Sequence, residues 1–83
     1  MRKVVEAIVN DDFTLDITFG DGSVRRFDMK PYLDYPIYRK LKNVDYFRDV
    51  KVAFDTVQWS ESEDISPDTL FLESIPLGEK VVA

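Results

Sequence analysis

The stretch FTLDITFGDGSVRRFD, residues 13–28, carries the clearest strand pattern in the chain. In residues 13–19, large apolar side chains alternate with Thr and Asp, as in an antiparallel strand with one buried face. Residues 20–22 (GDG) follow directly and include two glycines that tolerate positive φ, so they predict a tight turn. Residues 23–28 then form the returning strand. The stretch therefore predicts a β-hairpin.

The strands on either side of this turn are not equally regular. Val24 and Phe27 cannot share one face of a regular strand, so we expect a bulge there or a strand covered on both faces. Upstream, residues 3–10 are rich in Val and Ile and predict an earlier strand, followed by turn-forming Asx residues. Its expected inward side chains are Val5, Ala7 and Val9. The three strands, joined by short turns, predict an antiparallel meander.

The second half of the chain begins with a pattern typical of a helix and then returns to patterns typical of strands. Pro36 is well placed near the first position of a helix, where its missing N–H costs nothing. Apolar residues then recur at i, i+4 and i+7 and define the expected buried face of one short helix: Ile37, Leu41 and Val44. Residues 45–48 predict a tight turn. Residues 50–54 and 57–59 alternate again and predict a later hairpin.

The C-terminal part predicts a loop, a short helix and a tail. Residues 61–64 are polar and loop-like, and Ser66-Pro67-Asp68 is a cap-and-start signal for a helical turn ending near Leu72. The order is β-β-β-α-β-β-α, which places the chain in the α+β class, with a small antiparallel sheet and its helices on one face or end. We expect residues 1–74 to form a single domain and residues 75–83 a loose tail.

Composition excludes several classes of protein. The 83 residues contain neither Cys nor His, which removes disulfides, thiolate chemistry, the commonest general base and the commonest metal ligand. No apolar run approaches the roughly 20 residues needed to cross a bilayer, and the N-terminus lacks the apolar region of a secretory signal. We therefore expect a cytoplasmic protein without enzymatic activity, cofactor or membrane partner.

The formal charge of −5 is unevenly distributed. Residues 24–51 carry eight basic and four acidic side chains, whereas residues 52–83 carry one basic and seven acidic. A net acidic chain is an improbable general partner for nucleic acid, because phosphate binding needs a basic footprint. The segment 25–51 nevertheless keeps a nucleic-acid-associated regulatory domain open as the alternative function. Its candidate nucleic-acid contacts are Arg25, Arg26, Arg39, Lys40 and Lys42.

Four tyrosines lie among these cations and admit three interpretations. Aromatic rings interleaved with cations occur on single-strand nucleic-acid surfaces, but tyrosine is equally typical of protein interfaces and of rings that cover a core. The acidic C-terminal third could complete a contact surface for a basic protein. The candidate protein interface consists of Tyr32, Tyr35, Tyr38, Tyr46, Asp64 and Asp68.

A loose group of carboxylates offers a less specific possibility. Oxygen ligands suit hard cations, but the spacing here lacks the alternating Asx residues, turn glycine and distal Glu of a calcium loop. Asp64 also has a simpler capping role beside the Ser66-Pro67 turn. A metal-dependent enzyme is therefore the weakest of three hypotheses, and it would use Glu61, Glu63, Asp64 and Asp68.

Several motifs, in this order, make the chain resemble one bacterial family. They are FTLDITFGDG at residues 13–22, RFD at 26–28, PYL at 31–33, Phe47, Trp59 and DISPDTLF at 64–71. Over roughly residues 3–74, the chain resembles the uncharacterised family known as domain of unknown function 2442. The combination with Trp59 and the DISPD run is more specific than the hairpin alone.

The resemblance implies a fold and a partner class, but no catalytic site. It implies a small α+β fold and transfers no functional residues. Genes of the family often adjoin those of another small family, domain of unknown function 4160, in an arrangement like that of toxin–antitoxin pairs. The resemblance therefore implies a protein-interaction module, the acidic antitoxin-like partner of a neighbouring gene product. A homodimer also stays open, since an exposed edge strand could pair two copies.

Overall fold

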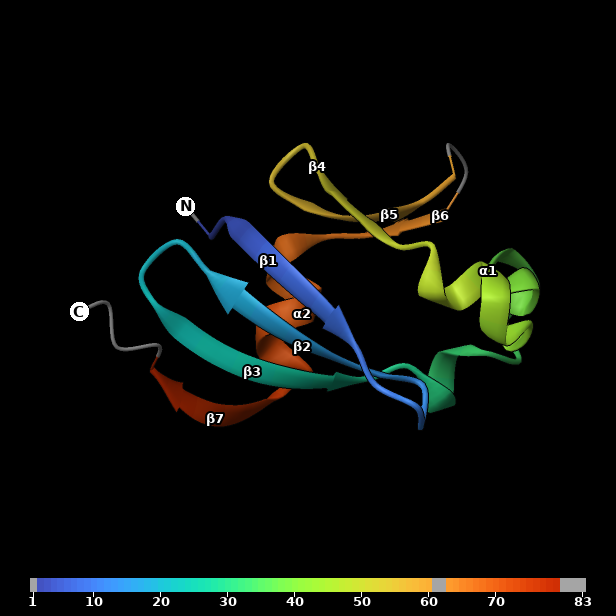
Figure 1. Ribbon diagram of the computed structural model, residues 1–83, viewed down its shortest axis with the longest axis horizontal. Helices are drawn as coiled ribbons and strands as arrows, with labels where there is room; N and C mark the ends of the chain where they lie inside the picture. The colour runs from blue at the N-terminus through green and yellow to red at the C-terminus, as the bar shows by residue number, and fades with distance from the viewer. Residues whose placement is uncertain (1, 61–62, 80–83) are drawn as a thin grey trace.

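The computed structural model describes residues 2–60 and 63–79, and it confirms the predicted α+β class (Figure 1). Two antiparallel sheets are present, with order β1-β2-β3-β7 in the larger and β4-β5-β6 in the smaller. In chain order the elements are β1 (Val4–Val9), β2 (Thr14–Phe19), β3 (Ser23–Asp28), the 3-10 helices η1 (Lys30–Tyr32) and η2 (Pro36–Lys42), α1 (Val44–Arg48), β4 (Lys51–Ala53), β5 (Thr56–Trp59), β6 (Glu63–Ile65), α2 (Pro67–Leu72) and β7 (Ile75–Glu79).

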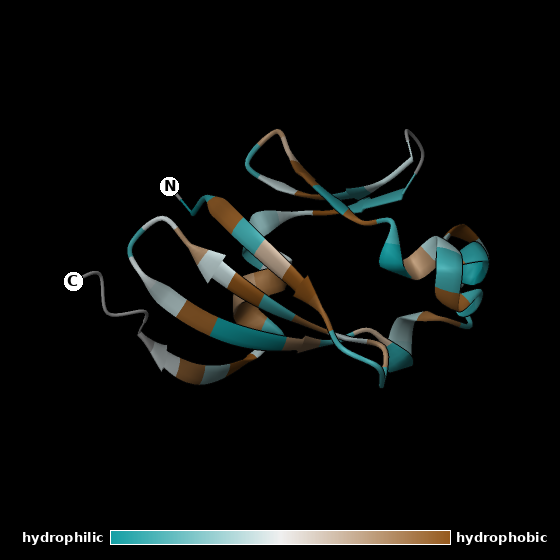
Figure 2. Cartoon of the chain, in the orientation of Figure 1, coloured by the Kyte–Doolittle hydropathy of each residue, from teal (hydrophilic) through white to brown (hydrophobic). Residues whose placement is uncertain are grey.

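The larger sheet begins with the predicted meander. β2 pairs with both β1 and β3, and its inward side chains, Leu15, Ile17 and Phe19, are buried. Figure 2 shows the alternation of hydrophobic and hydrophilic residues along these strands. The period of two therefore orients β2 as the sequence predicts.

The inward face of β1 differs from the prediction at one position. The register with β2 shifts between Val4 and Glu6, so Val4 is buried while Val5 has an exposed fraction of 51%. Ala7 and Val9 do pack against the core. A bulge turns the residues before it onto the other face, so strict alternation gives the wrong orientation for Val5.

The predicted loose tail is wrong for residues 75–79. They form β7, which pairs with β3 and becomes the edge of the larger sheet, while residues 80–83 lie outside the described residues. The expected bulge of β3 lies on this side, where the register shifts between Val24 and Arg25. Pro and Gly inside a strand predict irregular chain, but both are tolerated at an edge, where one row of backbone groups needs no partner.

The predicted helix is shorter than expected, and the tight turn predicted at residues 45–48 is instead a second helix, α1. η2 is a 3-10 helix, and α1 begins after it with the Asn43 side chain accepting hydrogen bonds from Asp45 N and Tyr46 N. Leu41 is buried as predicted, but Ile37 has an exposed fraction of 58% and Val44 is also exposed. A 3-10 helix repeats every three residues, so the predicted i, i+4, i+7 face does not form.

The predicted later hairpin is the start of a three-stranded sheet. β4 and β5 form it, and β6 adds a strand that includes the end of the predicted polar loop. Residues 61–62 of that loop lie outside the described residues. Trp59 of β5 pairs with Glu63 of β6, so both side chains face inward. The predicted helical turn is α2, where Ser66 Oγ accepts a hydrogen bond from Thr69 N at 3.1 Å.

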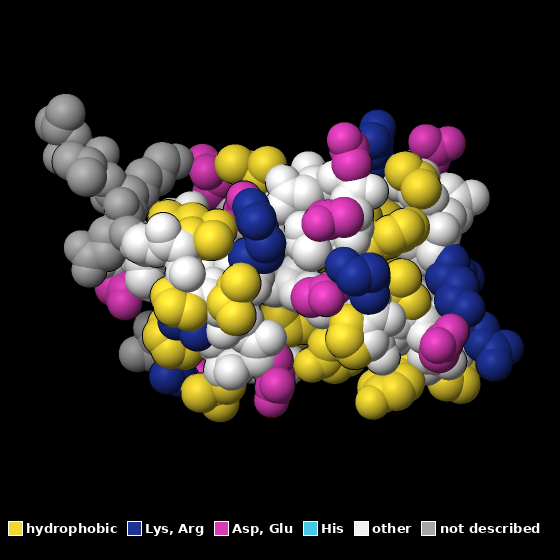
Figure 3. All heavy atoms as spheres, turned by 90° about the horizontal axis from the view of Figure 1, so that it is seen from below, with side chains coloured by type: hydrophobic (Ala, Val, Ile, Leu, Met, Phe, Trp, Pro, Cys, Tyr) yellow, Lys and Arg dark blue, Asp and Glu magenta, His cyan; other side chains and the backbone are white. Residues whose placement is uncertain are grey.

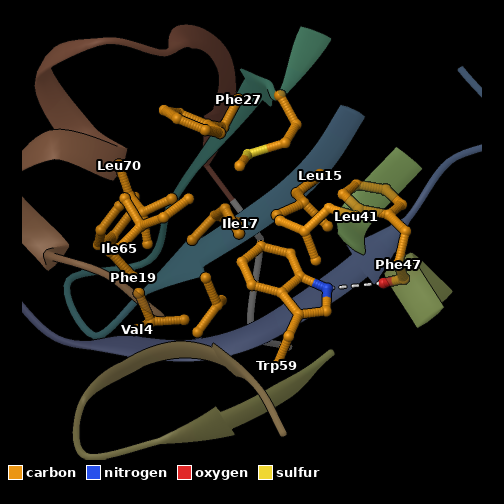
Figure 4. Close-up of a cluster of buried hydrophobic side chains, with 12 residues drawn as sticks. Val4, Leu15, Ile17, Phe19, Phe27, Leu41, Phe47, Trp59, Ile65 and Leu70 are labelled. Atoms are coloured by element: carbon orange, nitrogen blue, oxygen red, sulfur yellow. Dashed lines mark hydrogen bonds between the residues drawn. The ribbon is translucent and has the colours of Figure 1, made fainter. Parts of the chain in front are cut away.

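The core lies between the two sheets and the short helices (Figure 4). Trp59 is fully buried, stacks on Phe47 at a ring separation of 5.7 Å, and donates from Nε1 to the Phe47 carbonyl oxygen at 2.8 Å. This bond satisfies the indole N–H, which would otherwise be an unpaired buried donor. The buried hydrophobic residues are Val4, Leu15, Ile17, Phe19, Phe27, Met29, Leu41, Phe47, Val57, Trp59, Ile65 and Leu70.

Candidate functional site

Three of the four candidate tyrosines form one cluster. Pro31 and Pro36 lie at the starts of η1 and η2, where a fixed φ favours the first helical turn. The tyrosines follow at intervals of three residues, and the Tyr32 ring contacts Tyr35 at 5.9 Å and Tyr38 at 6.5 Å in edge-to-face geometry. The Tyr32 ring also stacks on the buried Phe27 ring at 5.3 Å. Edge-to-face and stacked pairs of this kind hold rings in fixed orientations.

The cluster grades from the core to the surface. Tyr32 is half-buried, and burial raises its pKa. Burial also raises the pKa of Tyr38, whose hydroxyl donates to the main-chain oxygen of Asp64 at 2.9 Å. Tyr35 has an exposed fraction of 54%. The structure thus brings Tyr32, Tyr35, Tyr38 and Asp64 together and leaves mainly Tyr35 available to another molecule.

Tyr46 does not join this cluster. Its hydroxyl donates to the Glu63 carboxylate, and this hydrogen bond raises the pKa of Tyr46. Glu63 is only 3% exposed because its pairing with Trp59 turns it inward. The bond connects α1 to β6, so the contacts of Tyr46 are those of a structural residue.

Asp68 lies in a different part of the molecule. It is in the first turn of α2 and forms an ion pair with Arg2 at 3.0 Å. The Arg2 guanidinium also lies over the Phe71 ring, 4.2 Å from its centre. These residues border a cleft of about 620 Å³, hereafter the N-terminal cleft. Its lining residues are Arg2, Lys3, Phe19, Gly20, Asp21, Asp68 and Phe71.

The candidate metal-binding carboxylates face different ways. Glu61 lies outside the described residues, Glu63 is buried against Tyr46, and Asp64 alternates onto the opposite face of β6. Asp68 is paired with Arg2. Within residues 2–60 and 63–79, no three acidic side chains gather as metal ligands would.

Two of the candidate nucleic-acid contacts have structural partners. Arg25 donates to Ser74 Oγ at 2.7 Å and to Ser74 O at 2.6 Å, and thereby fastens β3 to the segment before β7. Arg26 forms two hydrogen bonds with Asp16, at 2.8 and 3.1 Å, across the β2–β3 pair. These bonds lower the pKa of Asp16. The Asp16 carboxylate offsets the charge of Arg26, so Arg26 contributes little to a phosphate-binding field. The neutral Ser74, by contrast, holds the Arg25 side chain in place without offsetting its charge.

The other three candidates lie on η2. Lys42 pairs with Asp34 at 2.8 Å, and Arg39 lies near enough to help lower the pKa of that carboxyl, but neither Arg39 nor Lys40 forms an ion pair among the described residues. In Figure 3, Lys and Arg side chains gather at the end of the molecule that holds η2 and α1. Two unpaired cations make a local positive patch, but a smaller one than the sequence predicts.

The sequence pattern missed the apolar part of this end. Because i, i+4 spacing assigned Ile37 and Val44 to the core, neither was a candidate contact, yet both are exposed. A period of three, running from the tyrosines to Leu41, leaves Ile37 off the inward face. It does not account for Val44, which is three residues after Leu41 and begins the separate helix α1. We define the η2–α1 surface as Tyr35, Ile37, Arg39, Lys40 and Val44.

Of the comparisons with known proteins, the one with protein families finds a match. The family model described as "Protein of unknown function (DUF2442)" matches residues 4–76, which confirms the resemblance. Neither the curated proteins nor the solved structures include a match. None of the helices in the described residues is long and apolar enough to cross a membrane.

Proposed function

Since the chain belongs to the family of proteins of unknown function DUF2442, we propose from its geometry that it is a small, non-enzymatic, cytoplasmic protein-interaction module. The observation that carries this proposal is the η2–α1 surface, where Tyr35, Ile37 and Val44 are exposed on elements that also carry two cations with no ion pair among the described residues. An aromatic and two aliphatic side chains beside unpaired charge have the composition of a protein contact.

The surface is pre-organised by the residues beneath it. Tyr35 contacts the half-buried Tyr32, and Tyr38 bonds to β6 through its hydroxyl. Leu41 anchors η2 in the core. Side chains that are already ordered lose little conformational entropy on binding, which favours affinity. We infer that the partner presents apolar residues with an acidic rim, and that it is another small protein, as in an antitoxin-like pair.

Capture of the tagged chain's partner from host lysate, followed by calorimetric titration of the purified pair, tests this proposal. Ile37→Ser should weaken the affinity at least about tenfold, because the most exposed apolar side chain of the surface is lost. Ile8→Ser is the matched control, since Ile8 has a similar exposed fraction of 52% but lies on β1. Equal affinities of both variants would contradict the proposed surface.

The nucleic-acid alternative makes a different prediction. It requires salt-sensitive binding to single-stranded DNA or RNA that is lost in an Arg39→Ala, Lys40→Ala double variant. The ion pairs of Arg26 with Asp16 and of Lys42 with Asp34 weigh against it. Binding at low salt that this variant abolishes, without any protein partner, would favour the alternative.

A further inference from the structure

The turn between β4 and β5 presents an aromatic residue in an unfavourable backbone conformation. Phe54 and Asp55 are the two central residues, with φ of 52° and 66°, and Ala53 pairs with Thr56 on either side. Two successive positive φ values define a type I′ turn, for which Asn-Gly is the favoured sequence. Phe54 also has an exposed fraction of 90%. Neither the backbone nor the core of this chain therefore explains a phenylalanine here.

The turn is held against the rest of the molecule. Val4 N donates to the main-chain oxygen of Asp55 at 2.9 Å, and Lys3 Nζ lies 3.9 Å from Asp55 Oδ1. Both contacts come from the start of β1. Phe54 is thus an exposed ring on a braced two-residue turn, a geometry that suits a pre-organised anchor for binding.

The N-terminal cleft lies beside this anchor. Lys3 both lines the cleft and approaches Asp55, so the two features adjoin. The β4–β5 turn projects above the N-terminal end of β1, and both lie on the side of the molecule away from α1 (Figure 1). Phe71 lines the cleft with the Arg2 and Arg25 guanidinium groups over its ring, at 4.2 and 4.3 Å from its centre, and the buried Phe19 supports it from 5.3 Å.

The cleft also has a charge that suits the anchor. Asp21 accepts from Ser23 N and Oγ, and Asp68 is paired with Arg2. The Lys3 side chain is 62% exposed, and within residues 2–60 and 63–79 its one ion-pair contact is the 3.9 Å approach to Asp55. A ring followed by a carboxylate, as in Phe54-Asp55, therefore matches a cleft that offers a guanidinium over the Phe71 ring and an exposed lysine, because cations attract the face of an aromatic ring.

We propose that a second copy of this chain docks at this end, with Phe54 of each protomer in the N-terminal cleft of the other. Asp55 of each protomer then faces Lys3 of its partner, replacing the long contact within the chain. Because anchor and cleft adjoin on one surface, a two-fold axis satisfies both contacts at once and closes the assembly at two copies. The η2–α1 surface is at the opposite end and stays available, so this dimer is independent of the proposed function.

Sedimentation equilibrium over a concentration series tests the dimer. Phe54→Asn should raise the dissociation constant at least about thirtyfold, as expected for loss of a central aromatic anchor. Ile37→Ser is the matched control, because it removes an exposed apolar side chain at the other end and should leave the dimer intact. A monomeric wild type, or a dimer that survives Phe54→Asn, overturns the proposal.

A mixing experiment tests the reciprocal arrangement. Gly20→Gln adds a side chain at the cleft. Gly20 does not have a positive φ, and a Cβ there meets Lys3 O at an ordinary 3.7 Å, so the backbone should accept the substitution. Gly20→Gln and Phe54→Asn should each be monomeric alone. An equimolar mixture should form heterodimers, since one anchor and one cleft remain, and native mass spectrometry distinguishes them by mass. A mixture without heterodimers rules out the reciprocal contact.

The two proposals fail separately. Phe54→Asn should bind the protein partner as well as wild type does, and Ile37→Ser should lose the partner but keep the dimer. If Phe54→Asn abolishes partner binding while the wild type is a monomer, then Phe54 binds the protein partner, and the proposed dimer is wrong.

Discussion

The β2–β3 and β4–β5 hairpin turns are built from opposite kinds of residue. The β2–β3 turn uses Gly22 at a φ of 90°, and the Asp21 side chain accepts hydrogen bonds from Ser23 N and Oγ. The β4–β5 turn places Phe54 and Asp55 at positive φ, where a side chain crowds the backbone. The first turn is what its sequence favours by itself. The second forms because the strands beside it pair and pack, which leaves its residues available for another purpose.

The largest effect should come from the core anchor of the second hairpin. Trp59→Ala should reduce the free energy of unfolding by about 3–5 kcal/mol, because it removes the largest buried side chain and its bond to Phe47. In a chain of this size the variant should be largely unfolded. Urea unfolding followed by circular dichroism measures it, with Val52→Ala on exposed β4 as the control; near wild-type stability of Trp59→Ala would show that this hairpin is not needed for the fold.

The first turn should be sensitive to a single methyl group. Gly22→Ala should lower the free energy of unfolding by about 1–2 kcal/mol, because an L-residue is disfavoured at its positive φ. Gly20→Ala is the neighbouring control: a Cβ there is 3.7 Å from Lys3 O, and we expect little change. Thermal unfolding of both variants measures the difference, and equal Tm values would contradict a special role for the positive φ of Gly22.

The second turn should respond in the opposite direction. Phe54→Asn should raise the free energy of unfolding of the monomer by about 1 kcal/mol, because Asn tolerates positive φ and no buried contact is lost. Unfolding at the lowest measurable protein concentration separates this gain from any effect of dimerisation. A loss of stability would show that Phe54 has a folding role which its exposure hides.

The smallest effect concerns the charged pair across the first hairpin. Asp16→Asn should cost about 0.5–1 kcal/mol through loss of the two bonds from Arg26. These bonds lower the pKa of Asp16, so their contribution is present above the ordinary carboxyl pKa and is lost as the pH falls through the folded-state value. Asp16→Asn should therefore show a weaker acid dependence of stability than wild type between about pH 5 and 2. An unchanged dependence would assign the acid sensitivity to other groups.

Alkaline pH should act on the other sheet. The bond to Glu63 raises the pKa of Tyr46, so stability is present below the ordinary tyrosine pKa near 10 and declines as the pH rises through the folded-state value. Tyr46→Phe should lose that part of the alkaline dependence. Tyrosinate absorbance and unfolding measured together test this, and an identical alkaline profile in the variant would contradict it.

The candidate site was predictable in composition but not in arrangement. The density of tyrosines singled out Tyr32, Tyr35 and Tyr38, and the structure gathers these three. Tyr46 and Asp68 were grouped with them by nearness or charge, yet their partners Glu63 and Arg2 are distant in the sequence and fix them elsewhere. A signal for Phe54 existed, since a two-residue connection between strands without Gly or Asn is unusual.

The sequence by itself determined those elements whose causes are local. The period of two in residues 13–19, the glycines at 20–22 and the Ser66-Pro67 start each act within a few residues, and each gave the structure expected of it. Prediction from the sequence fails where pairing or packing with a distant segment determines the conformation of a residue.

Only the tertiary structure decided the remaining features. β7 exists because β3 offers an edge roughly fifty residues earlier in the chain, and Glu63 is buried because it pairs with Trp59. The bulge that exposes Val5 arises where β1 pairs with β2. The 3-10 helix η2 repeats every three residues and places Leu41 in the core. Pairing and packing free energies exceed weak local propensities, so long-range contacts set which side chains face outward, and hence which surfaces are free to bind.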